Sequence, residues 1–172
     1  MSYLKNQEFL GLLNLMSQKP SRMDDAYLVY QVAKYAAESL DGDIVLIEPD
    51  LWMVRLVELC TKSSPYIPKV HVVSRFNPDT TGSMDEFKLM VGPTVLLHNA
   101  MESQMDLGSK WSFVYLGDPW LSEKLAPHIM SRMISRGKLV ANSSCSRVSY
   151  LSGFPGVMKI ELSNHQVLYF FE

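Results

Sequence analysis

Apolar and polar residues alternate along the chain in two patterns, one typical of helices and one typical of buried strands. Small and aliphatic side chains recur at helical spacing in residues 21–40, which predicts a helix with Ser21 and Asp24 as its N-terminal capping pair. The next apolar run, residues 44–48 (IVLIE), is typical of a strand buried on both faces. A second helix is expected over residues 51–62, where a proline-containing segment ends it.

The same alternation continues in the second half of the chain. Further strands are expected at residues 69–74, 112–117 and 138–142. A helix is expected over residues 121–137, with a break at Pro127. The order of these elements is that of strands and helices wound alternately into a parallel sheet.

The end of the chain departs from this pattern. Two apolar runs, residues 157–162 and 166–171, flank a short polar turn and predict an antiparallel hairpin. We therefore expect an α/β fold, with a doubly wound, mainly parallel sheet and a C-terminal antiparallel hairpin. Residues 77–110 fit either a short helix and a strand or two helices. We expect a single domain over residues 1–172, and we assign no element to residues 1–20.

The composition narrows the classes of protein. The 172 residues are 47% hydrophobic and 20% charged, as in an ordinary globular protein. The net charge is −2 and the basic residues are scattered, which argues against a protein built mainly to hold nucleic acid. The chain has no apolar run long enough to cross a membrane and no signal-peptide pattern at its start. Because Cys60 and Cys145 lie outside any metal-ligand spacing, we expect a reduced, cytoplasmic protein.

Acidic residues follow two of the expected strands. Glu48 and Asp50 come directly after the run IVLI, and Asp118 ends a later strand just before Pro119 and Trp120. The carboxyl ends of parallel strands meet at the edge where α/β proteins bind ligands, so one interpretation is a ligand site. The other interpretation is structural, because an acid placed just before a helix can cap its first turn.

These motifs resemble those of the class I S-adenosylmethionine-dependent methyltransferases. In that superfamily a strand ends in an acid that grips the ribose hydroxyls, and IVLIEPDLWMVRLVELC is similar to this motif. A later strand ends in an acid beside the reacting centre, and FVYLGDPW is similar to it. The run GKLVAN resembles the precorrin-type methyltransferases, and the closing hairpin also fits the superfamily. The resemblance covers roughly residues 21–172 and implies a Rossmann-like fold with methyl transfer to a small or planar acceptor.

The resemblance also implies roles for individual residues. Asp118 would orient the acceptor or act as a base, and Trp120 would stack on a flat substrate or on the cofactor. The residues implied to bind S-adenosylmethionine are Glu48, Asp50, Ser74, Arg75 and Asn77.

One departure from the family affects the expected binding. The family's first strand ends in a glycine-rich turn, GxGxG, and before residue 21 only the segment FLGLLNLMSQKPSR is available for that strand. Gly11 lies inside the apolar run, while residues 16–20 stand where the glycines are expected. Side chains there would fill space that glycines leave open, and Pro20 lacks a backbone donor. We therefore expect weak or absent cofactor binding in the isolated chain, with function involving a protein partner.

Two further functions remain open. One is a non-catalytic, methyltransferase-like subunit that acts through contacts with a partner. The other is a receiver-like domain in which Asp118 accepts a phosphoryl group. No metal site is expected, because the four histidines share no ligand spacing. Residues 143–146 lack the spacing of a nucleophile elbow and are expected to form a polar loop lining the cleft.

Overall fold

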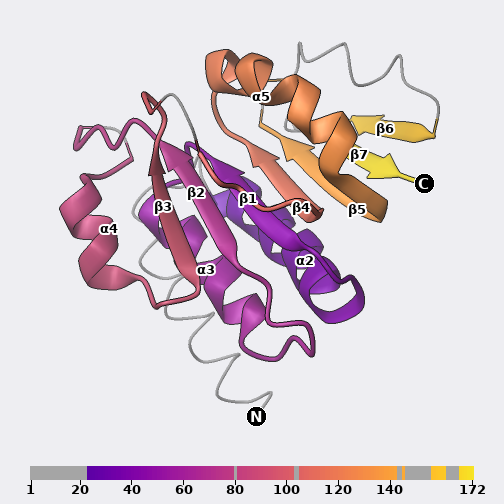
Figure 1. The fold of residues 1–172 in the computed structure, drawn as a ribbon, viewed down its shortest axis with the longest axis horizontal. Coiled ribbons are helices and arrows are strands. Elements are labelled where there is room, and N and C mark those ends of the chain that lie inside the picture. The colour runs from indigo at the N-terminus through magenta and orange to yellow at the C-terminus, as the bar shows by residue number, and fades with distance from the viewer. Residues whose placement is uncertain (1–22, 80, 103–104, 143–144, 146–155, 162–166) are drawn as a thin grey trace.

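The computed structural model describes residues 23–79, 81–102, 105–142, 145, 156–161 and 167–172. The strands in these ranges form one sheet with the order β3-β2-β1-β4-β5-β7-β6 (Figure 1). The strands are β1 Asp43–Ile47, β2 Val70–Ser74, β3 Val95–Asn99, β4 Trp111–Leu116, β5 Met133–Ala141, β6 Val157–Glu161 and β7 Val167–Phe171. Neighbouring strands from β3 to β5 are parallel, and β7 is antiparallel to both β5 and β6. The predicted α/β fold is confirmed.

Helices cover both faces of the sheet. In Figure 1, α2 and α3 lie behind the strands, α5 lies in front, and α4 lies beside the edge strand β3. The helices are α2 Met23–Ser39, α3 Leu51–Thr61, α4 Met84–Met90 and α5 Pro119–Arg132. This arrangement buries the central strands β1, β2 and β4 between two helical layers, as their continuous apolar runs require.

Side-chain oxygens fix the starts of three helices. Asp50 caps α3 by accepting a hydrogen bond from the Met53 backbone N–H (2.9 Å). Ser83 and Glu86 form a reciprocal capping box at the start of α4. Asp118 caps α5 and is followed by proline at the first helical position. These caps satisfy backbone donors that would otherwise lack partners, and they set where each helix leaves the sheet. The predicted cap of α2 by Ser21 lies outside the described residues.

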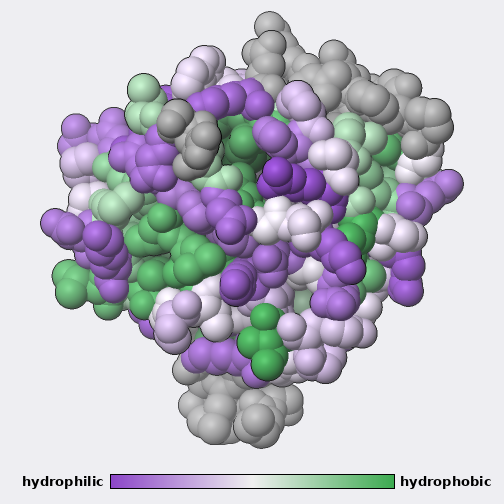
Figure 2. Space-filling view, in the orientation of Figure 1, coloured by the Kyte–Doolittle hydropathy of each residue, from purple (hydrophilic) through white to green (hydrophobic). Residues whose placement is uncertain are grey.

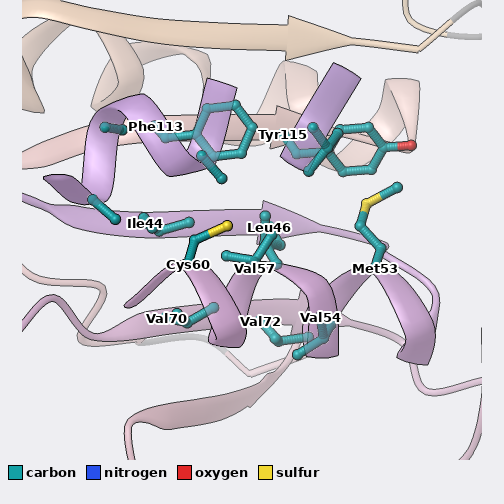
Figure 3. Packing of buried hydrophobic residues seen from close by; sticks show 14 of the residues in the cluster. Ile44, Leu46, Met53, Val54, Val57, Cys60, Val70, Val72, Phe113 and Tyr115 are labelled. Carbon is teal, nitrogen blue, oxygen red and sulfur yellow. The ribbon is translucent and has the colours of Figure 1, made fainter. Parts of the chain in front are cut away.

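The core has one apolar cluster on each face of the sheet. Behind the sheet, Val54, Val57 and Cys60 of α3 pack against alternate residues of β1, β2 and β4 (Figure 3). In front, the intervening residues of the same strands pack against α5, with Val45 and Ile47 fully buried. Successive side chains of a strand point to opposite faces of the sheet. Because both faces are covered by helices, residues 44–47 of β1 and 113–116 of β4 are apolar at every position.

Two predicted elements need correction. Helix α5 continues through Pro127 without ending there and stops at Arg132, five residues before the predicted end. Pro127 lies on the exposed side of the helix, where a missing backbone hydrogen bond costs less than in the core. Strand β5 begins at Met133, opposite Trp111 of β4. Pairing with the neighbouring strand therefore outweighs the helical pattern of the sequence at this point.

The described residues of the ambiguous region 77–110 form one helix and one strand. Helix α4 and strand β3 occupy it, and β3 lies at the edge of the sheet. Only Val95 in β3 is fully inside the core, and Leu96 is exposed. A strand with so little buried surface lacks the apolar run that identified the others, which explains the ambiguity.

The place of β1 in the sheet changes one interpretation. Residues 43–47 lie between β2 and β4, where the strand order reverses. In a doubly wound sheet of this order that is the place of the first strand, not of the second. The expectation that the first strand of the fold precedes residue 21 is therefore wrong, because β1 takes that place. The turn that follows the central strand is Glu48-Pro49-Asp50, and the segment we had expected to supply that turn lies outside the described residues.

Candidate functional site

The carboxyl ends of β1, β2 and β4 bring three predicted residues into one polar network. Glu48 follows β1, Arg75 follows β2, and Asp118 follows β4. Because these strands are adjacent and parallel, their ends open at the same edge of the sheet. Figure 2 shows a mainly hydrophilic surface over the ends of β1 and β2, at the upper left of the view.

Glu48 reaches sideways from β1 to the end of β2. Its Oε2 accepts a hydrogen bond from Ser74 Oγ (2.9 Å), and its Oε1 accepts one from the Arg75 backbone N–H (2.7 Å). Glu48 has a φ of +50°, a left-handed conformation that is costly for a residue with a side chain. The turn thus places a carboxylate at the end of the second strand, although the residue follows the first.

Arg75 links this carboxylate to Asp118. Its Nη2 lies 3.1 Å from Asp118 Oδ2, and its guanidinium lies 5.2 Å from the ring centroid of Trp120. Lys124 of α5 also approaches that ring, with Nζ 5.7 Å from the centroid. Trp120 is 51% exposed, so much of this cationic and aromatic surface faces solvent.

Both helix-preceding acids act as caps. Asp118 Oδ2 accepts from the Leu121 backbone N–H (2.9 Å) while it is paired with Arg75. Asp50 is buried and caps α3. The structural interpretation therefore holds for both residues. For Asp118 it coexists with a place in the network at the edge, because one carboxylate can accept several hydrogen bonds.

Ser74 and Asn77 have different surroundings. Ser74 is fully buried, and its Oγ donates to Glu48 while it accepts from the Phe76 backbone N–H (2.9 Å). Asn77 is exposed, and its Oδ1 accepts from the backbone N–H of Asp79 (2.9 Å) within the turn after β2. The structure thus joins Ser74 to the network and gives Asn77 a role in its own turn.

Gly117 holds the ends of β1 and β4 together. Its backbone N–H donates to the Ile47 carbonyl (2.8 Å), which extends the contact between the two strands past the last residue of β4. A Cβ at this position would lie 2.5 Å from the Ile47 oxygen and 2.8 Å from the Glu48 oxygen. Both of these atoms belong to the backbone and cannot easily move aside. This edge therefore requires glycine.

A second polar cluster was not predicted from the sequence. His71 Nδ1 lies 3.1 Å from His98 Nε2, and His71 Nε2 lies 3.2 Å from Asp43 Oδ2. The two histidines are 27 residues apart in sequence but stand on the adjacent strands β2 and β3. Only the register of these strands could have revealed the contact, because the spacing of the two histidines along the chain matches no known pattern.

The surroundings of this cluster shift two pKa values. Burial lowers the pKa of His98, and the neighbouring His71 lowers it further. Burial alone would raise the pKa of Asp43, but hydrogen bonds from His71 and from the Lys69 backbone N–H hold it below its ordinary value. Together these effects favour a neutral His98 and an ionised Asp43 at the two ring nitrogens of His71.

Other kinds of site find little support in the described part of the chain. Within it, no group of three or more His, Cys, Asp or Glu side chains is arranged to hold a metal ion. No helix found there is long and apolar enough to span a membrane. A small pocket lies over α2 and α3, away from the carboxyl edge, and is lined by Tyr30, Lys34, Glu38, Leu59 and Cys60. The predicted polar loop at residues 143–146 falls outside the described residues except for Cys145, which is buried.

The sheet order also bears on the receiver interpretation. A receiver has the flavodoxin-like order 2-1-3-4-5, whereas this sheet runs 3-2-1-4-5 and continues into an antiparallel pair. The receiver interpretation is therefore wrong.

Comparisons with known proteins identify the fold. No protein-family model matches the chain, and no curated protein sequence matches it. A methyltransferase from Geobacter sulfurreducens superposes with a TM-score of 0.64 and 11% identity, over 94% of this chain and 90% of its own. The SAH-bound methyltransferase PaMTH1 from Podospora anserina gives 0.66 and 10%, over 95% and 87%. An rRNA methylase from Streptococcus thermophilus gives 0.56 and 14%, over 84% and 93%. At these identities the similarity shows that the chain has the fold of these methyltransferases.

Proposed function

We propose that the chain is an S-adenosylmethionine-dependent, methyltransferase-like protein that binds its cofactor over the carboxyl ends of β1, β2 and β4. The observation that carries the proposal is the position of the Glu48 carboxylate. In the family that the sequence resembles, an acid at a strand end grips the ribose hydroxyls. Here Glu48 presents its carboxylate at the end of β2, against Ser74 and Arg75.

The carboxylate keeps capacity for a ligand. Each oxygen of Glu48 accepts one hydrogen bond from the network, and a carboxylate oxygen can accept two. The side chain is also only half-buried, so solvent or a ligand can reach it. A ribose diol would donate to the two oxygens, and the backbone that follows Ser74 would lie beside the adenine ring.

Weak binding in the isolated chain is part of this proposal. The turn after the central strand is Glu48-Pro49-Asp50, where the resembled family has glycines. Pro49 lacks a backbone donor, and the side chain of Asp50 is committed to capping α3. The amino-acid end of the cofactor would therefore find fewer backbone donors and less space than a glycine-rich turn provides.

The acceptor would lie beside Asp118 and Trp120. Trp120 offers a half-exposed indole ring to a small or planar molecule, and Asp118 stands at the end of β4 on the same edge. Catalysis of methyl transfer consists mainly of holding the acceptor nucleophile in line with the methyl group, with a nearby base to take its proton. Asp118 is the candidate base.

Calorimetric titration with S-adenosylmethionine and S-adenosylhomocysteine tests this proposal. We expect weak binding to the wild type and at least about tenfold weaker binding to Glu48→Gln, because hydrogen bonds to a charged group are lost. Glu58→Gln is the matched control, since Glu58 also accepts a hydrogen bond from a backbone N–H, that of Gly92, but lies on α3. Equal affinity in the wild type and Glu48→Gln would remove Glu48 from the site. Absence of binding to the wild type would contradict the cofactor proposal.

A non-catalytic, partner-binding subunit is the second candidate. The observation that favours it is the exposure of Trp120 beside two cationic side chains, since exposed aromatic and arginine side chains are common in protein interfaces. In that case Glu48 and Asp118 would serve only to organise the turns. Failure of both ligands to bind at millimolar concentration, with the fold intact, would favour this candidate.

A further inference from the structure

The ion pair between Arg75 and Asp118 joins strands that are not neighbours. Arg75 follows β2 and Asp118 follows β4, while β1 lies between these strands. Adjacent strands are about 4.8 Å apart, so the pair bridges a gap of about 10 Å. The two side chains therefore meet above the carboxyl end of β1, the strand whose following turn would receive the cofactor.

The backbone at the base of Arg75 is held firmly. The Arg75 N–H donates to Glu48 (2.7 Å), and the next N–H, that of Phe76, donates to Ser74 Oγ (2.9 Å). Phe76 has a φ of +53°, and its buried ring packs edge-on against Phe87 with the centroids 5.3 Å apart. A left-handed residue next to Arg75 persists only where its surroundings hold it, so the direction in which Arg75 leaves the strand is fixed.

The guanidinium end, in contrast, contacts the partly buried carboxylate of Asp118 and the half-exposed ring of Trp120. The Arg75 side chain is 45% exposed and that of Asp118 is 22% exposed. The other contact of the Arg75 guanidinium is the half-exposed ring of Trp120. Ion pairs in such surroundings contribute little and are screened by salt, so this contact can open at small cost.

We propose that the Arg75–Asp118 ion pair is an autoinhibitory latch. The pair lies across the carboxyl end of β1 and must open before a nucleoside-type ligand can bind there. The inference rests on the proposed function. The ion pair also compensates the negative charge of Asp118. Opening it therefore frees both the carboxyl end of β1 for the ligand and Asp118, the candidate base. A latch of this strength lowers the affinity for the ligand without abolishing binding.

Titration of S-adenosylhomocysteine into four proteins tests the latch. The ligand is zwitterionic at neutral pH, so its own attraction to the protein depends little on salt. We expect about two- to fivefold tighter binding to Arg75→Gln and to Asp118→Asn, the range set by the strength of an exposed pair. Asparagine keeps the cap of α5, so Asp118→Asn removes the charge without removing the helix start. Raising the salt concentration is expected to tighten binding to the wild type and to leave Arg75→Gln unchanged.

The matched control is Arg136→Gln. Arg136 also has one side-chain hydrogen bond, to the Tyr35 hydroxyl (2.6 Å), and lies beside an aromatic ring, but it belongs to β5. Its affinity for the ligand should equal that of the wild type. Weaker or unchanged binding to Arg75→Gln, with measurable wild-type binding, would overturn the latch and leave the proposed function standing. No binding by any of the four proteins would overturn both.

Discussion

Strands β1 and β2 carry two polar clusters, one at their carboxyl ends and one near their amino ends. At their carboxyl ends, Glu48 and Arg75 join Asp118 in a network that reaches solvent. Near the amino ends of the same strands, Asp43 and His71 join His98 of β3, and His71 is only 2% exposed. The exposed cluster contains groups that can exchange partners with a ligand, whereas the buried one ties three strands together. The clusters thus differ at their centres: the His71 side chain is 3% exposed and the Arg75 side chain 45%, whereas the carboxylates beside them, Asp43 at 26% and Asp118 at 22%, are alike.

The largest effect is expected where one substitution disrupts both clusters. Val45 is fully buried in β1, between Asp43 and Glu48. Val45→Asp would place an unpaired carboxylate in the core, at a cost of more than about 4 kcal/mol, and should unfold the protein. Circular dichroism and urea denaturation measure this, with Val45→Ala as a milder control. A cooperative transition at the wild-type midpoint would show that β1 is not central to the core.

The second prediction sets the buried cluster against the exposed one. His71→Ala leaves Asp43 and His98 without a shared partner and opens a cavity, so we expect a loss of about 3 kcal/mol in the free energy of unfolding. Arg75→Gln should cost less than about 1 kcal/mol, because its ion pair is exposed. Urea denaturation of both variants gives the difference. Equal losses would mean that depth does not separate the two clusters.

The smallest effect concerns pH. Because the pKa of His98 is lowered in the folded protein, the unfolded chain binds more protons, and stability falls as the pH drops below the ordinary value of 6.5. The lowered pKa of Asp43 adds a further loss below its ordinary value of 3.8, since this carboxylate stabilises the fold only while ionised. Unfolding midpoints between pH 7.5 and 5.5 should decrease in the wild type and change less in His98→Gln. A stability that rises on acidification over this range would contradict the assignment.

The sequence predicted the exposed cluster better than the buried one, for a physical reason. An acid directly after an apolar run must lie where the strand leaves the core, so Glu48 and Asp118 could be assigned to the carboxyl edge. The contact between His71 and His98 depends on how β2 and β3 align, which no local pattern encodes. The edge strand β3 was ambiguous because it buries little, and the end of α5 was misplaced because β5 pairs with β4 from Met133 onward. The place of β1 in the sheet followed only from the strand order.

The most direct test of the central claim, that the ligand site lies at the carboxyl ends of β1, β2 and β4, is an NMR titration of the labelled protein with S-adenosylhomocysteine. We predict that the backbone amides of Glu48, Ser74, Arg75 and Trp120 shift together and saturate at one weak affinity. The amides of His71 and His98, which belong to the buried cluster, should move little. Shifts confined to the pocket around Tyr30 and Cys60, or no shifts at saturating ligand, would contradict the claim.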